Sequence, residues 1–88
     1  MASEKAKKDV LRRAKIVEGH LKKVVSMIEN DDYCIDILNQ SLAVQNALKK
    51  IDEQILEDHL NGCVVHQIQN GQAKEAAREV LQVFRRKA

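Results

Sequence analysis

A run of 24 residues between Cys34 and His59 contains neither Pro nor Gly, and it restricts this chain to folds built around one long helix. Apolar residues recur every three or four positions along the run, at Ile37, Leu38, Leu42, Val44, Leu48, Ile51 and Ile55. Such a period marks one face of an amphipathic helix, which buries that face against other helices. The pattern predicts a central helix over residues 32–69 of the 88-residue chain.

Shorter segments on either side of the central run carry the same helical period. Residues 5–29 and residues 72–86 each place apolar residues on one stripe, with many of their charged residues off it. No linker, internal repeat or low-complexity tract separates these segments. We therefore expect a single all-α domain over residues 1–88, in which each protomer has three helices and the central one is the longest.

Polar residues and glycines mark the expected ends of the helices. Ser3 is a candidate N-cap for the first helix, and the Asn and Asp residues at 30–32 are candidate N-caps for the central helix. Gly71 suits the left-handed position that follows a helix C-terminus, so the central helix is expected to end beside it. Gly19 lies inside the first helix at a cost of about 1 kcal/mol relative to Ala, and close packing of another helix is the ordinary reason for such a glycine.

The hydrophobic content is too high for a three-helix monomer to bury. Of the 88 residues 44% are hydrophobic, although only Tyr33 and Phe84 are aromatic. A chain of this length forms a small core, which leaves much aliphatic surface in water and predicts self-association. No apolar run approaches the roughly 18 residues of a membrane span, and the basic N-terminus lacks the apolar core of a signal peptide. We therefore expect a soluble, cytoplasmic protein that does not enter a membrane.

The thiol and imidazole groups lie at the two ends of the central run. His59 and Cys63 are four residues apart, which places them on one helix face about one turn apart. Cys34 precedes His59 by 25 residues, or roughly 37 Å along a straight helix at ~1.5 Å per residue. Two antiparallel copies would set Cys34 of each beside His59 and Cys63 of the other, in two identical sites. The spacing therefore suggests a metal or thiol site that exists only in an oligomer.

Charge is distributed unevenly over the chain, whose formal net charge is +2. Residues 1–23 carry a net charge of +5, residues 24–63 a net charge of −6 and residues 64–88 a net charge of +3. Basic ends around an acidic middle are typical of a nucleic-acid-binding protein, although solvated helix faces give the same pattern. The chain has no glycine-rich phosphate loop and no Ser/His/Asp arrangement in a predicted cleft, so we do not expect an enzyme.

A set of residues around the two ends of the central helix forms a specific pattern. It comprises Tyr33, Cys34, Ile35, Asp36, Ile37, Leu38, Gln40, Ala43, Val44, Ala47, Leu48, Asp58, His59, Leu60, Cys63 and Val64. The pattern resembles the CsoR/RcnR family of small, all-helical bacterial repressors that sense metals or reactive small molecules. The resemblance covers residues 8–72 well and the C-terminal helix loosely. It implies a transcriptional repressor in which antiparallel helical dimers assemble into a tetramer, a dimer of dimers.

The residues at the three sensing positions distinguish the branches of this family. Cys34, His59 and Cys63 match the copper-sensing branch, and two soft thiolates select Cu(I), so the resemblance implies that these residues bind Cu(I). Nickel- and cobalt-sensing relatives have an N-terminal His and a His where Cys63 stands. Formaldehyde sensors lack the second Cys, and persulfide sensors lack the His. A persulfide- or thiol-stress-sensing repressor and a nickel-type sensor are the alternatives within this fold, and a helical assembly protein is the alternative outside it.

The resemblance also implies where operator DNA binds. Arg13 and Lys50 fall at positions where the family carries basic residues tied to operator binding, and the neighbouring Arg12 and Lys49 extend this basic set. Binding of Cu(I) across a subunit interface favours one quaternary arrangement. If the DNA-binding arrangement holds the metal less well, metal binding must weaken DNA binding by linkage.

Four further residues concern the surroundings of the ligands. Tyr33 and Glu79 lie at or near positions where the family has partners of the ligand histidine, which orient its ring and carry the signal outward. His20 departs from the glutamine common in the family, and His66 lies three residues beyond Cys63. Either histidine is a candidate additional ligand, and a polar residue at a surface or interface is the alternative for both.

Overall fold

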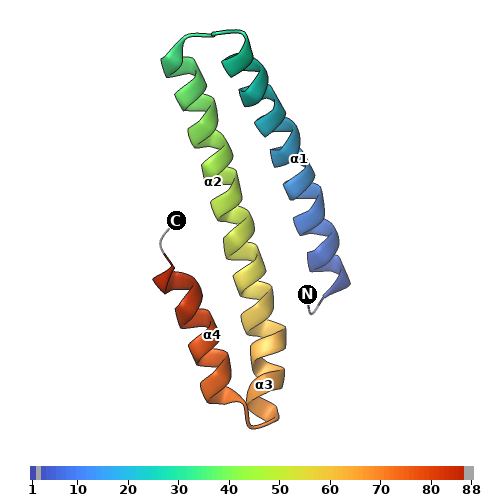
Figure 1. The fold of residues 1–88 in the computed structure, drawn as a ribbon. Coiled ribbons are helices and arrows are strands. Elements are labelled where there is room, and N and C mark those ends of the chain that lie inside the picture. Colours follow the sequence, from blue (N-terminus) through green and yellow to red (C-terminus); the bar gives the residue numbers. More distant parts are fainter. Residues whose placement is uncertain (2, 87–88) are drawn as a thin grey trace.

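Two long antiparallel helices form the body of the molecule, and a shorter helix lies beside the second of them (Figure 1). The computed structural model describes residue 1 and residues 3–86. Its elements are α1 (Glu4–Glu29), α2 (Cys34–Asp58), the π-helix η1 (His59–Val64), α3 (Val65–Gln69) and α4 (Ala73–Arg85). The prediction of an all-α fold with a long central helix is therefore confirmed.

The central helix runs from α2 through η1 into α3 without a break. The residues at the two junctions, His59 and Val65, both have right-handed helical backbone angles. The helix begins at Cys34, two residues later than predicted, and ends at Gln69 as predicted. The sequence did not predict η1, a turn of π-helix of the kind that is frequent at functional sites.

The residues at the helix ends agree with the sequence in two places and differ in one. The Ser3 hydroxyl accepts a hydrogen bond from the Ala6 backbone N–H at 3.2 Å, and Gly71 adopts the left-handed conformation with φ 76°. The N-cap of α2 is Tyr33, which makes no side-chain capping bond, so the prediction of a cap at residues 30–32 is wrong. Asp31 instead has φ 54° and forms the tight turn between α1 and α2, a conformation that Asp tolerates better than most residues.

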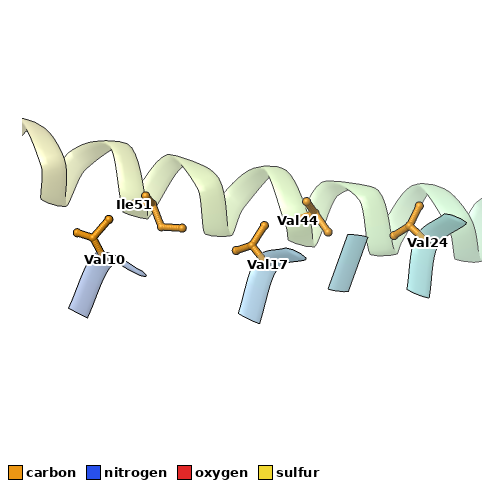
Figure 2. Packing of buried hydrophobic residues seen from close by; sticks show 5 residues of the cluster. All are labelled: Val10, Val17, Val24, Val44 and Ile51. Atoms are coloured by element: carbon orange, nitrogen blue, oxygen red, sulfur yellow. The ribbon is translucent and has the colours of Figure 1, made fainter. Parts of the chain in front are cut away.

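The core lies between α1 and α2 and follows a seven-residue repeat. Figure 2 shows its five buried residues: Val10, Val17 and Val24 from α1, with Val44 and Ile51 from α2. A strict seven-residue spacing keeps one seam of each helix facing the other, as in left-handed coiled coils. Full burial of each such side chain contributes roughly 1.5–3 kcal/mol, so this seam is the main stabilising contact of the hairpin.

The three rods lie in one thin layer, with α4 and α1 on opposite sides of α2 (Figure 1). The principal extents are 55 × 29 × 14 Å, and the radius of gyration is 17.1 Å, against roughly 12 Å for a compact chain of this length. A single layer leaves both of its faces open to solvent. Many aliphatic side chains are consequently exposed, including Ile16 at 62%, Ile28 at 56% and Leu42 at 54%. Among the residues that the structure describes, no helix is both long and apolar enough to cross a membrane.

Candidate functional site

Cys34 is the first residue of α2 and lies at the tip of the hairpin. Its side chain is exposed and its thiol is free. Tyr33, the preceding residue, is also exposed. The tight turn at residues 30–32 presents both side chains at one end of the molecule, where the described part of this chain provides no second thiol or imidazole.

His59 and Cys63 occupy the opposite end of α2. His59 is the first residue of η1 and Cys63 lies within it, and both side chains are half-buried. A π-helical turn holds more residues than an α-helical turn, so a step of four residues completes nearly one turn and returns to the same face. The pair is therefore directed to one side of the rod by local backbone structure alone.

The three sulfur and nitrogen groups do not meet within one chain. Cys34 and His59 lie at opposite ends of α2 (Figure 1). Among the described residues, no group of three or more His, Cys, Asp or Glu side chains is close enough to bind a metal ion. A single chain thus provides one end with a lone thiol and another with a thiol and an imidazole. Two thiols and one imidazole form a donor set that fits a soft ion such as Cu(I), but only if two chains contribute.

A largely apolar groove of about 640 Å³ separates α2 from α4. It is lined by Lys49, Asp52, Glu53, Ile55, Leu56, His59, Glu79, Val80, Val83 and Phe84. Glu79 and His59 therefore face the same groove, although they lie on different helices. The structure does not bring Tyr33 to this groove within the chain, because Tyr33 lies at the other end of α2 (Figure 1).

The two arginines expected to bind DNA lie side by side on α1 and share one carboxylate. Arg12 Nη2 lies 2.8 Å from Asp9 Oδ1, and Arg13 Nε lies 3.4 Å from Asp9 Oδ2. The Gln54 amide of α2 donates a hydrogen bond of 2.5 Å to Asp9 Oδ2. The hydrogen bonds from Arg12 and then from Gln54 lower the pKa of Asp9, so its carboxylate is charged at neutral pH. Neither Asp9 nor Gln54 was predicted to belong to this surface. Asp9 could have been found from its i,i+3 and i,i+4 spacings to Arg12 and Arg13, whereas Gln54, 45 positions away, has no such signal.

The two lysines expected to bind DNA, Lys49 and Lys50, lie on the part of α2 that packs beside the arginine-bearing part of α1. Figure 2 places Val10 of α1 beside Ile51 of α2, so Lys50 and Arg13 belong to neighbouring turns of the two helices. Both lysines are exposed, but Lys49 lines the groove toward α4. The structure thus groups the arginines on one helix and sets Lys49 on the side of α2 that faces away from them.

The other two histidines, His20 and His66, each have a hydrogen-bond partner that is none of the three candidate ligands. His20 Nε2 lies 2.7 Å from Gln40 Oε1 and links the middle of α1 to α2. His66 Nε2 lies 3.0 Å from Nδ2 of Asn70, the C-cap residue of α3. Since an amide oxygen only accepts, Nε2 of His20 is the donor in the first pair, whereas the Asn70 amide donates in the second.

Comparison with known proteins places this geometry among metal-responsive repressors. The sequence model of a family described as metal-sensitive transcriptional repressor matches residues 6–86. The copper-sensing transcriptional repressor CsoR of Bacillus subtilis (strain 168) is 42% identical over 84 residues, which are 96% of this chain and 83% of that protein. CsoR of Mycobacterium tuberculosis (strain H37Rv) is 36% identical over 75 residues, which are 85% of this chain but only 63% of that longer protein.

A solved structure has the same architecture. The crystal structure of the copper-sensing repressor CsoR with Cu(I) from Geobacillus thermodenitrificans NG80-2 superimposes with a TM-score of 0.87 at 36% sequence identity. The match covers 93% of this chain and 85% of that chain. The helical layer described above is therefore also the fold of a copper-sensing repressor whose crystal structure contains Cu(I). Cu(I) is the kind of soft ion that thiolate ligands select.

Proposed function

Because the chain belongs to the metal-sensitive transcriptional repressor family, we propose that it is a Cu(I)-responsive repressor that binds operator DNA when metal-free and releases it on Cu(I) binding. Membership in a family of repressors also confirms the expectation that the chain is not an enzyme. The observation that carries the proposal is the set of Cys34, His59 and Cys63 at the two ends of α2, in a chain 42% identical to a copper sensor. The protein acts in the cytoplasm, where its operators lie.

Cu(I) is bound between two chains. Cys34 of one protomer supplies a thiolate to the His59 and Cys63 pair of an antiparallel partner, since no single chain brings the three together. Thiolate ligands select Cu(I) over harder ions. A bound Cu(I) would offset one of the two thiolate charges, and its ligands would tie the tip of one hairpin to the far end of another. Each dimer has two such sites because its halves are related by a two-fold axis.

Self-association as a dimer, and of two dimers as a tetramer, is supported by the shape of the protomer. A layer only 14 Å thick exposes aliphatic residues such as Ile16, Ile28 and Leu42 on faces that a partner layer is able to cover. Domains are built from at least two packed layers around a core, and one chain supplies only one layer. The second layer is a second copy.

The groove between α2 and α4 is the route by which the ligand site affects the rest of the protomer. His59 is a ligand on one wall and Glu79 is a carboxylate on the other, so Glu79 is placed to orient the imidazole and to fix α4 against α2. Tyr33 approaches the same histidine only from the partner, because it precedes Cys34. Copper loading then favours one arrangement of α4, and DNA affinity falls because that arrangement binds DNA less well.

DNA is bound by the basic side chains of the hairpin, namely Arg12 and Arg13 of α1 together with Lys49 and Lys50 of α2. All four are exposed, and phosphate contacts by Arg and Lys supply most of the affinity of such surfaces. Reversing the charge of Arg13 or Lys50 should weaken DNA binding and flatten its salt dependence while leaving copper affinity unchanged. Unchanged DNA binding by both variants would move the DNA surface elsewhere.

The experiment that tests the whole proposal begins with metal-free protein under anaerobic conditions. Duplexes that bind it are selected from a pool of random sequence, and their affinity is then measured during titration with Cu(I) in the presence of a competing chelator. We expect one Cu(I) per chain and a fall in DNA affinity that is complete at that stoichiometry. Tight copper binding without any change in DNA affinity would contradict the proposal.

A further inference from the structure

Asp9 is the only acidic residue in the most basic stretch of the chain. Residues 5–17 contain six Lys or Arg residues and this single carboxylate. Asp9 precedes Arg12 by three positions and Arg13 by four, so it lies on the same face of α1 as both. A carboxylate on a surface that binds phosphate repels the phosphate groups and therefore lowers the affinity for DNA.

The contacts of Asp9 place its two oxygens between the two guanidinium groups. Oδ1 faces Arg12 at 2.8 Å, and Oδ2 faces Arg13 at 3.4 Å. Gln54 of α2 donates a hydrogen bond of 2.5 Å to Oδ2, which holds the carboxylate at the boundary between the helices. The Asp9 side chain is 34% exposed, and those of Arg12 and Arg13 are 63% and 45% exposed. The carboxylate is thus fixed below two arginines that are open to solvent.

This arrangement has the chemistry of an internal substitute for a DNA phosphate. A carboxylate and a phosphate offer the guanidinium group the same kind of paired oxygen acceptors. We propose that Asp9, held by Gln54, competes with DNA phosphate for Arg12 and Arg13 and thereby sets the affinity of this surface for DNA. The proposal rests on the DNA-binding function proposed above. When DNA binds, the arginines exchange their contacts with Asp9 for contacts with phosphate. The free energy gained from the phosphate contacts is reduced by the cost of breaking the contacts with Asp9.

The expected size follows from the release of counterions. Each phosphate neutralised by a protein cation contributes about 0.9 to the slope of log affinity against log salt, which amounts to about eightfold in affinity at roughly 0.1 M salt. An arginine that is held by Asp9 supplies only part of such a contact. Asp9→Asn keeps the shape of the side chain and an acceptor for Gln54 but removes the charge. It should raise the affinity for duplex DNA by roughly three- to eightfold and steepen the salt slope by up to about 0.9 per arginine released.

The control is the matched pair on α4. Glu75 precedes Arg78 by three residues and makes an ion pair with it, as Asp9 does with Arg12, and both acids are charged because a hydrogen bond from their arginine lowers their pKa. Glu75→Gln changes the net charge by the same amount as Asp9→Asn but frees an arginine outside α1. Asp9→Ala provides a second charge-removing variant in case Asp9→Asn folds poorly, and thermal melting of each variant monitors folding.

The test measures binding of the metal-free, full-length protein to a pool of short duplexes of random sequence over a range of salt concentrations. The inference is supported if Asp9→Asn or Asp9→Ala binds more tightly with a steeper slope, Glu75→Gln matches the wild type, and the Asp9 gain disappears in an Arg12→Ala, Arg13→Ala background. Equal gains from Asp9→Asn and Glu75→Gln would show a general charge effect and overturn it. If the arginine variant weakens binding but Asp9→Asn has no effect, the inference fails and the proposed DNA surface stands. If the arginine variant binds as the wild type does, both fail.

Discussion

The hairpin of α1 and α2 and the region formed by η1 and α4 are held in different ways. The hairpin buries five residues along a continuous seam, in which they recur every seven positions on each helix. The partly buried Ala14, Ile37 and Ala47 pack against this seam. In α4 only Ala76 is buried, and the helix joins the body mainly through α3. A groove of about 640 Å³ remains between α4 and α2, with Val83 and Phe84 on its wall exposed at 66% and 68%.

The difference teaches where a switch is possible in a chain this small. The hairpin has a buried seam of its own within one protomer, and this seam sets α1, with its arginines, against α2. The α4 end is incomplete within one protomer, and it is also the end that holds His59 and Cys63. Elements that move in regulation come from the weakly packed part of a structure. The proposed ligands His59 and Cys63 therefore lie where a bound ion and a partner chain would have the largest effect on packing.

The largest effect is expected from removing either thiol, because the comparison requires the two ends of α2 to form one site across chains. Cys34→Ala and Cys63→Ala should each lower Cu(I) affinity by more than about 100-fold. Loss of a residue that only hydrogen-bonds to a ligand costs up to about 100-fold, and loss of a ligand itself should cost more. A purified mixed dimer of one Cys34→Ala chain and one Cys63→Ala chain should regain a single site, since its intact residues meet at one end only. Competition with a chelator measures both results, and failure of the mixed dimer to bind copper would contradict the cross-chain site.

The next largest effect is on stability and tests whether the two regions differ as described. Ile51→Ala removes a buried side chain from the hairpin seam and should lower the free energy of unfolding by about 2–5 kcal/mol. Val83→Ala on α4 removes a side chain that is 66% exposed and should change it by no more than about 0.5 kcal/mol. Chemical denaturation of both metal-free variants gives the comparison. A loss at Val83 as large as that at Ile51 would mean that α4 is as firmly packed as the hairpin.

A smaller effect separates copper binding from its consequence at the α4 end. His59→Ala leaves both thiols in place, so the variant should bind Cu(I) more weakly and yet fail to release DNA. The lost quantity is the coupling between the two ligands, typically 1–3 kcal/mol or roughly 5–150-fold in affinity. DNA affinity is measured with and without Cu(I) for the variant and the wild type.

The same variant distinguishes the alternative in which sulfur chemistry is the signal. Cys34 and Cys63 are both free thiols, and a persulfide sensor would bridge Cys34 of one chain to Cys63 of the partner through sulfur, without any imidazole. His59→Ala should then respond fully to a persulfide donor while the wild type ignores copper. Full copper-driven release of DNA by His59→Ala would exclude the proposed role of the groove, even if copper is the natural ligand.

The hairpin could be predicted from the sequence because its determinants are local. The seven-residue spacings of Val10 and Val17 on α1 and of Val44 and Ile51 on α2, in segments without Pro, indicate two amphipathic helices without reference to another chain. The ligand positions were predicted from spacing and resemblance together. Tyr33 as N-cap was missed because the polar Asp31 was used to form the turn, where its own φ is positive, rather than to cap α2.

The parts that the sequence could not provide depend on contacts between distant residues. No residue type in the π-helical turn at His59–Val64 demands that conformation, so the sequence pattern gives no signal for it. The Asp9 and Gln54 pair spans 45 positions, so it appears only once the hairpin sets α1 against α2. Gly19 was expected to allow close packing of another helix, but apart from the adjoining backbone of α1, no atom of the described residues lies within 4 Å of where its Cβ would be.

A last prediction, also of a small effect, uses that glycine to test whether a partner helix packs against α1. Because the position is open within the chain and its backbone is helical, Gly19→Ala should raise the free energy of unfolding by about 1 kcal/mol through helix propensity alone. Denaturation at low protein concentration measures this gain, and sedimentation measures assembly at higher concentration. If the new methyl group instead destabilises the protein and reduces its mass in solution, a partner helix lies against Gly19. The part of α1 around Gly19 would then belong to the interface that Ile16, Ile28 and Leu42 are proposed to form, and the contrast between the two regions would hold only within a single protomer.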